Sequence, residues 1–231
     1  MSRLPKLVQM HLAVVCAFFV ITQSVKGVEA EANVTLSSDY SFRGVSQTGL
    51  DPAIQGGFDI ALDNGFAIGT WASNVNFNSE TSMELDLYAS WTSDTIGDLF
   101  TISGSIIRFE YPSEGDILDY MEFSIGVNVW NASFGLNFSN EYFGANGPSF
   151  IYPFVGVSWE QEDQFSVAAH IGWSSVDSDN FFGPGEDSYM DASLSVTVPI
   201  AELDVTGSLV GSTLDDPSAE FRFILSLGKS F

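Results

Sequence analysis

Apolar and polar residues alternate along most of the chain. The pattern is clearest over residues 82–92 and 121–130, and it returns at 134–138, 165–173 and 221–227. Successive side chains of a β-strand point to opposite faces, so a period of two predicts strands with one apolar and one polar face. Beyond the N-terminal segment, no stretch has a convincing helical period. The chain is therefore expected to be all-β.

The polar face distinguishes two folds that share this alternation, a soluble β-sandwich and a membrane barrel. Gly, Ser, Thr, Asn and carboxylates dominate this face, which suits a water-filled lumen. The expected strands run for about ten to fourteen residues. Soluble strands usually have about five or six, and a tilted strand spans a bilayer with about nine to eleven. Because lipid offers no partner for free N–H groups, a spanning sheet must close. We therefore predict a transmembrane antiparallel barrel, with the sandwich as the alternative.

Turn-forming residues divide the chain after residue 32 into about twelve strands. Short connections and longer polar loops alternate along the chain, as they do in up-and-down outer-membrane barrels. This alternation places both chain ends at the periplasmic side. The short connections fall at 63–65, 95–98, 131, 160–163 and 199–202, and the longer loops at 47–52, 76–82, 110–119, 141–148, 177–188 and 214–218.

The N-terminal segment has the features of a cleaved signal peptide. Arg3 and Lys6 precede a largely apolar run over residues 7–21, which is short for a membrane span. The small residues of Ala30-Glu31-Ala32 follow, so we expect cleavage after Ala32, with Ala30 as the alternative. Residues 1–32 are thus predicted to be the signal peptide, and residues 33–231 to be one barrel domain in a Gram-negative outer membrane. The terminal Phe231 ends an alternating strand and is expected to act as a signal for the barrel-insertion machinery.

The charge of the chain excludes several classes of function. The chain has thirty acidic and seven basic residues, for a net charge of −23. Such acidity argues against nucleic acid, because contacts to phosphate need Lys and Arg. The single cysteine, Cys16, lies in the predicted signal peptide, so the mature chain can form neither a disulfide framework nor a thiolate metal site. We expect no cofactor.

Part of the chain resembles a known family. The strings SSDYSFRGVSQT (37–48), PAIQGGFD (52–59), GFAIGTWASNV (65–75) and ELDLYASW (84–91) occur in this order. They are similar to segments of the TorF-type porins, a family of bacterial proteins long catalogued as conserved hypothetical. The resemblance implies an outer-membrane barrel that acts as a diffusion pore, and it names no solute.

Strand parity identifies the residues expected to line the lumen. Carboxylates on a low-dielectric wall attract cations, so a pore of this kind is expected to prefer cations. Arg43 and Arg222 are placed on the first and last strands, where they would bridge to acids such as Asp39, Asp59 or Glu84. An equally weighted alternative is that the charges only solvate a plugged interior. The full predicted set is Asp39, Arg43, Asp59, Glu84, Asp86, Glu122, His170, Asp191, Asp204 and Arg222.

Other functions are weaker on this sequence. A lipid enzyme would need a histidine beside a serine nucleophile, and His170 is the one histidine left after cleavage. A structural or adhesive barrel that does not conduct is the main alternative to a pore. The acidic loop 177–188 could bind Ca²⁺ or Mg²⁺, but its spacing is not that of an EF-hand. The expected partners are outer-membrane lipids, lipopolysaccharide and small solutes or cations, and no stretch marks a subunit interface.

Aromatic residues near the expected strand ends are predicted to form the interfacial girdles of a membrane barrel. A soluble sandwich would bury them instead. These residues are Tyr40, Phe42, Trp71, Trp91, Trp130, Tyr142, Phe143, Trp159 and Trp173.

Overall fold

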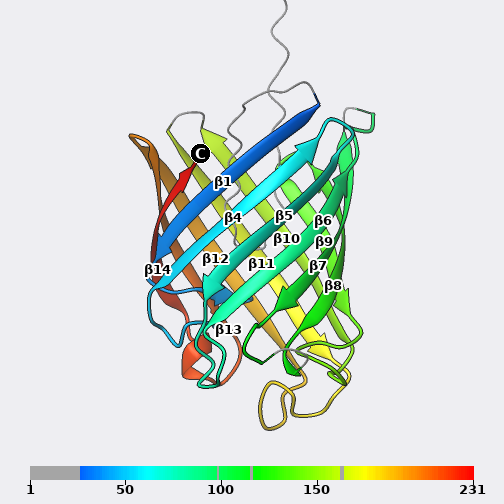
Figure 1. Ribbon diagram of the computed structural model, residues 1–231, viewed down its shortest axis with the longest axis vertical. Coiled ribbons are helices and arrows are strands. Elements are labelled where there is room, and N and C mark those ends of the chain that lie inside the picture. Colours follow the sequence, from blue (N-terminus) through cyan, green and yellow to red (C-terminus); the bar gives the residue numbers. More distant parts are fainter. Residues whose placement is uncertain (1–26, 98, 115–116, 162–163) are drawn as a thin grey trace, which may run out of the picture.

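The protein is a closed antiparallel β-barrel (Figure 1). The computed structural model describes residues 27–97, 99–114, 117–161 and 164–231, and within these ranges twelve strands form the barrel. They are β1 (Val28–Ser37), β4 (Ala53–Leu62), β5 (Phe66–Asn74), β6 (Met83–Thr92), β7 (Phe100–Glu110), β8 (Tyr120–Val129), β9 (Ala132–Ser139), β10 (Phe150–Gln161), β11 (Phe165–Val176), β12 (Ser188–Ile200), β13 (Leu203–Ser212) and β14 (Arg222–Ser230). The predicted fold class is confirmed.

Two smaller elements complete the described chain. The strands β2 (Ser41–Phe42) and β3 (Val45–Ser46) form a separate two-stranded hairpin, and η2 (Pro217–Ala219) is a single 3-10 turn. None of the described residues belongs to a helix that is long and apolar enough to cross a membrane.

Each barrel strand pairs with its neighbour in sequence, and β1 closes the barrel against β14. That last pairing runs from Asn33 opposite Ser230 to Ser37 opposite Ser226. The backbone of Phe231 extends it by donating to Ala32 (2.8 Å) and accepting from it (3.3 Å). Closure satisfies the N–H and C=O groups that would otherwise line a free sheet edge.

The two ends of the barrel differ in their connections. Tight turns such as 63–65, 130–131 and 201–202 lie at one end, which we call the turn end and which is uppermost in Figure 1. The C-terminus lies there too. Longer connections, including 75–82, 140–149 and 177–187, gather at the opposite loop end. Short and long connections therefore alternate as predicted.

The two faces of the wall follow the sequence alternation. On β8, Met121 and Ile125 are exposed, whereas their neighbours Tyr120, Glu122 and Ser124 are buried in the interior. The outward face carries exposed apolar side chains on strand after strand, with Ile54 65% and Phe223 68% exposed. An apolar surface this extensive is not compatible with water on all sides and fits a surrounding of lipid.

The start of β1 bears on the predicted signal peptide. Residues 1–26 of that segment lie outside the described residues, while residues 28–32 form the first half of β1 and pair with β4. The seam with β14 begins only at Ala32. Cleavage after Ala32 would therefore leave almost all of the β1–β14 seam in place, and the cleavage site stays a prediction.

The buried core lies inside the barrel and is aromatic. Tyr142 stacks on Phe150 with ring centroids 3.9 Å apart, and Phe109 stacks on Tyr120 at 4.5 Å. Offset stacking of this kind contributes about 0.5–1.5 kcal/mol per pair beyond area burial. The cluster joins side chains of the wall to side chains of the loops and fills the lumen toward the loop end.

This core corrects the predicted aromatic girdle. Trp91, Trp159 and Trp173 are exposed on the outward face, and Trp130 is exposed in the turn between β8 and β9. Tyr40, Trp71 and Tyr142 are instead buried inside the barrel, and Phe42 and Phe143 pack against them. The inward group belongs to the plugged half of the lumen because its members lie on inward parity or on loops that fold inward.

Candidate functional site in the barrel lumen

The connection between β1 and β4 folds back into the barrel. We call residues 39–48 the plug hairpin. Its turn lies at Arg43 (φ 49°) and Gly44 (φ 82°), and two successive positive φ angles are typical of a tight hairpin turn. A Cβ on Gly44 would lie 2.6 Å from the carbonyl oxygen of Gly211, so the turn fits against β13 only without a side chain. The buried members of the hairpin are Tyr40, Ser41, Arg43, Ser46, Gln47 and Thr48, together with Asp39.

Asp39 fixes the base of the plug hairpin. Its Oδ1 accepts hydrogen bonds from the hydroxyls of Ser46 (2.6 Å) and Thr48 (2.8 Å). Its Oδ2 accepts from Nε of Arg222 at 2.6 Å, and Nη1 of Arg222 also donates to the carbonyl of Gly44 at 3.2 Å. The last strand of the barrel therefore holds both the base and the tip of the hairpin.

Arg43 crosses the lumen from the tip of the hairpin. Its Nη2 donates to Oε1 of Glu122 on β8 at 2.6 Å, and the two side chains are 4% and 2% exposed. The guanidinium carbon also lies 4.5 Å from the ring centroid of Phe42, 4.6 Å from that of Phe150 and 4.3 Å from that of Tyr152. Desolvated cation–π contacts are worth up to about 2 kcal/mol each. Arg43 is thus clamped by one buried charge and three rings.

Both arginines form the predicted bridges to inward carboxylates, but only Arg222 lies on the strand that was expected for it. Arg222 lies on the last strand and bridges to Asp39, as expected. Arg43 does not lie on the first strand and does not pair with Asp39, Asp59 or Glu84. Strand β1 ends before it, and the hairpin carries its side chain across to β8. Parity along a strand says nothing about a residue beyond the end of that strand.

Glu84 joins the plug hairpin to the wall on the other side. It accepts hydrogen bonds from the hydroxyl of Tyr40 at 2.7 Å and from that of Tyr111 at 2.8 Å. Asp86, on the same face of β6, is 3% exposed. The hairpin is therefore tied to β6, β8 and β14 by hydrogen bonds that each involve a charged group, and such bonds are the stronger ones in proteins.

His170 belongs to a buried polar group on β10, β11 and β12. The hydroxyl of Tyr152 donates to Oδ1 of Asp191 at 3.0 Å and lies 2.6 Å from Nε2 of His170. If that hydroxyl proton goes to Asp191, Nε2–H of His170 must donate to the tyrosine oxygen. Ser193 lies opposite His170 in the β11–β12 register, but no hydrogen bond joins them. Among the described residues, the polar partners of the His170 ring are Tyr152 and Asp191, and neither is the serine that a nucleophile of this kind requires.

The half of the lumen toward the turn end is lined differently. Asp59, which accepts from the hydroxyl of Tyr88 at 2.6 Å, and Asp204 lie on this part of the inner face and are partly exposed. Short polar side chains surround them and are also partly exposed. Three pairs hydrogen-bond across neighbouring strands: Ser195 with Ser208 (2.8 Å), Thr197 with Thr206 (2.8 Å) and Asn128 with Thr101 (3.2 Å).

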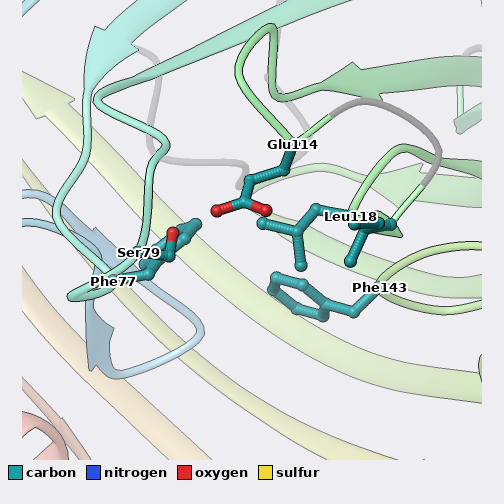
Figure 2. A pocket seen from close by; sticks show the side chains of 6 residues that line it. Phe77, Ser79, Glu114, Leu118 and Phe143 are labelled. Carbon is teal, nitrogen blue, oxygen red and sulfur yellow. The ribbon is translucent and has the colours of Figure 1, made fainter.

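A pocket of about 410 Å³ opens among the loops at the loop end (Figure 2). Phe77 and Ser79 come from the β5–β6 loop, Glu114 and Leu118 from the β7–β8 loop, and Phe143 from the β9–β10 loop, with Ile117 completing the lining. Figure 2 shows the carboxylate of Glu114 between Ser79 and Leu118. Sequence reasoning did not find this pocket, because parity and turn signals do not place loop side chains.

The described residues contain no group of three or more His, Cys, Asp or Glu side chains placed to hold a metal ion. The acidic side chains of loop 177–188 thus form no such group.

The comparisons with known proteins agree on the fold. A family model described as "Bacterial protein of unknown function (Gcw_chp)" matches residues 22–223. The KdgM porin is similar in structure at a TM-score of 0.57 and 8% identity, over 87% of this chain and 99% of that one. The NanC porin is similar at a TM-score of 0.56 and 9% identity, over 87% of this chain and 98% of that one. The COG4313 outer membrane channel from Pseudomonas putida F1 is similar at a TM-score of 0.50 and 11% identity, over 96% of this chain and 100% of that one.

The same comparisons bear on the TorF-type resemblance. They show a bacterial family and a barrel with the fold of outer-membrane porins and channels. The TorF-type name stays a prediction. A search of curated proteins gave no match.

Proposed function

The chain belongs to the bacterial family of unknown function Gcw_chp, and we propose that this member is an outer-membrane channel that admits small hydrophilic solutes and prefers cations. The signal peptide would export the chain, the insertion machinery would recognise Phe231, and the loop end would face outward among lipopolysaccharide. The plug hairpin would form the constriction of the channel.

The polar inner wall is the observation that carries this proposal. An interior that serves only to hold a barrel together is filled with large side chains, as the aromatic half of this lumen is. Toward the turn end the inner face instead carries partly exposed Ser, Thr and Asn side chains. Such a wall is suited to water and hydrophilic solutes.

The charge of the inner face supports the preference for cations. The wall strands bring Asp59, Glu84, Asp86, Glu122, Asp191 and Asp204 to the lumen. Against them stand Arg43 and Arg222, and each of these arginines is already paired with a carboxylate. The unbalanced charge is negative, so the field in the lumen favours cations and opposes anions.

The plug hairpin has the properties of a constriction that can move. Its ties are ion pairs, hydrogen bonds and aromatic contacts rather than packed aliphatic side chains. Several buried polar atoms around it make no hydrogen bond within the described part of the chain, and each such atom costs about 1–3 kcal/mol. These atoms are Asp86 Oδ1, Glu122 Oε2, Asn137 Oδ1 and His170 Nδ1. The closed arrangement therefore has a smaller advantage over a hydrated, open one than a fully satisfied core would have.

Planar-bilayer recording in a salt gradient tests the proposal. We expect discrete current steps and a reversal potential that marks cation selectivity. Asp204→Asn should weaken the selectivity because Asp204 lies on the inner face. Glu202→Gln is the matched control, because that carboxylate is 83% exposed in the adjacent turn and pairs with Lys229 outside the lumen. Anion selectivity, or an equal effect of both substitutions, would contradict the cation preference.

The second candidate is a structural barrel that does not conduct, and the filled aromatic half of the lumen favours it. The same recordings separate the two functions. A barrel that is heat-modifiable and fully β-folded, yet passes no current even after the plug hairpin is loosened, would establish the structural role.

A further inference from the structure

The pocket at the loop end has the composition of a binding site for an apolar ligand with a positive charge. Its walls are the rings of Phe77 and Phe143 and the aliphatic side chains of Ile117 and Leu118. Among the described residues of this lining, Glu114 is the charged one. Its Oε1 accepts a hydrogen bond from the backbone N–H of Glu80 at 2.9 Å, which holds the carboxylate in the lining of the pocket.

The same lining argues against other ligand classes. A sugar needs several convergent hydrogen-bonding groups, and in the described lining only Ser79 and Glu114 contribute polar side chains. An anion would meet the carboxylate, and the described lining residues include no Lys or Arg. A cation is attracted both by a carboxylate and by the faces of aromatic rings. An organic cation with an apolar body fits the carboxylate, the aromatic rings and the aliphatic side chains of the lining.

The pocket is adjacent to the groups that hold the plug hairpin. Phe143 stacks on Tyr120 at 5.3 Å and lies 6.4 Å from the ring of Tyr111, while Phe77 lies 5.6 Å from Tyr111. The hydroxyl of Tyr111 donates to Glu84, which also accepts from Tyr40 of the hairpin. A ligand in the pocket would therefore be separated from the constriction by one layer of aromatic side chains.

We propose that this pocket is an entry site for organic cations with an apolar body, such as aromatic or alkyl ammonium ions. The inference rests on the proposed function, because it names the class of solute that the channel would receive from the outside. Binding itself requires only the folded barrel and its loops, so it can be measured apart from conductance.

Equilibrium dialysis of three probes against the refolded full chain in detergent tests the site, with detergent alone as the blank. The probes are 2-phenylethylammonium, the neutral 2-phenylethanol and the anionic 3-phenylpropionate. We expect the cation to bind about three- to tenfold more tightly than the neutral probe, from one exposed ion pair and one or two cation–π contacts. The anion should bind most weakly.

Two substitutions and a control locate the site. Glu114→Gln keeps an acceptor for the N–H of Glu80 and removes the charge, so it should weaken binding of the cation by about two- to fivefold and leave the neutral probe unchanged. Ile117→Ser should weaken binding of both, because Ile117 is 69% exposed in the free protein and lines the pocket. Glu141→Gln removes one charge from the neighbouring β9–β10 loop and should have no effect.

The outcomes are distinct from those of the channel test. Equal binding of the three probes, no binding above the detergent blank, or an equal loss in Glu114→Gln and Glu141→Gln would each overturn the site. A cation-selective current without probe binding would leave the proposed function standing and remove this inference. Binding with the expected selectivity in a barrel that passes no current would retain the binding site and overturn the proposed channel function.

Discussion

Loss of the Arg43 charge should open the lumen. In Arg43→Gln, the carboxylate of Glu122 stays 2% exposed without the guanidinium that now lies 2.6 Å away. Removing one partner of a buried ion pair costs about 3–5 kcal/mol, and here the three ring contacts of the guanidinium are lost as well. Withdrawal of the plug hairpin lets water reach Glu122, so this cost falls mainly on the closed arrangement.

The expected shift follows from the cost of the ion pair alone. At about 1.4 kcal/mol for each factor of ten, about 3–5 kcal/mol changes the ratio of open to closed forms by about a hundred- to a few-thousand-fold. Single-channel recording measures the open probability, and the ratio of open to closed forms follows from it. Heat-modifiability on gels serves as the folding control, because neither Arg43 nor Glu122 contributes to the β1–β14 seam.

A double-mutant cycle separates the pair from its surroundings. Glu122→Gln in the Arg43→Gln background removes the unpaired buried charge, so the double variant should recover much of the closed population. An open probability of Arg43→Gln equal to that of the unmodified protein would refute the reasoning. Strictly additive effects of the two substitutions would refute it equally, since they would show that the pair does not hold the hairpin.

Three further outcomes are expected. Gly44→Ala should also raise the open probability, because a Cβ in this positive-φ turn would collide with the carbonyl of Gly211; recordings identical to those of the unmodified protein would contradict the tight fit. Deletion of Phe231 should reduce assembly in cells and leave folding into pure lipid vesicles nearly unchanged, whereas an equal defect in both would show a structural role instead of a signal. The intact mass of the mature chain should correspond to a start at Asn33, and a start at Val28 would show that all of β1 is retained.

The wall of the barrel could be predicted from the sequence because its physics is local. A strand between water and lipid must alternate, and a tight turn needs residues such as Asn64 and Gly65, so both leave a mark on neighbouring residues. The alternation also predicts that Trp71 points inward, because Trp71 shares the parity of Ser73. The girdle prediction rests only on how close Trp71 lies to a strand end.

The contents of the lumen could not be predicted in this way. The partner of Arg43 is 79 residues away in sequence, and that of Arg222 is 183 residues away. Which carboxylate each arginine meets depends on how the loop after β1 bends, and alternation carries no information about that bend. The string SSDYSFRGVSQT carries part of the family resemblance, and in the structure most of it forms the plug hairpin.

The bond between Asp39 and Arg222 also sets an order of events in time. Asp39 follows the first strand to be synthesised, and Arg222 opens the last. The lock at the base of the hairpin can therefore form only when β14 has arrived beside β1, at the end of the longest loop closure in the chain. A partly assembled sheet lacks this one tie, whereas the ties to Glu84 and Glu122 need only β6 and β8. The pair of Asp39 and Arg222 is therefore the part of the plug that depends on closure of the barrel.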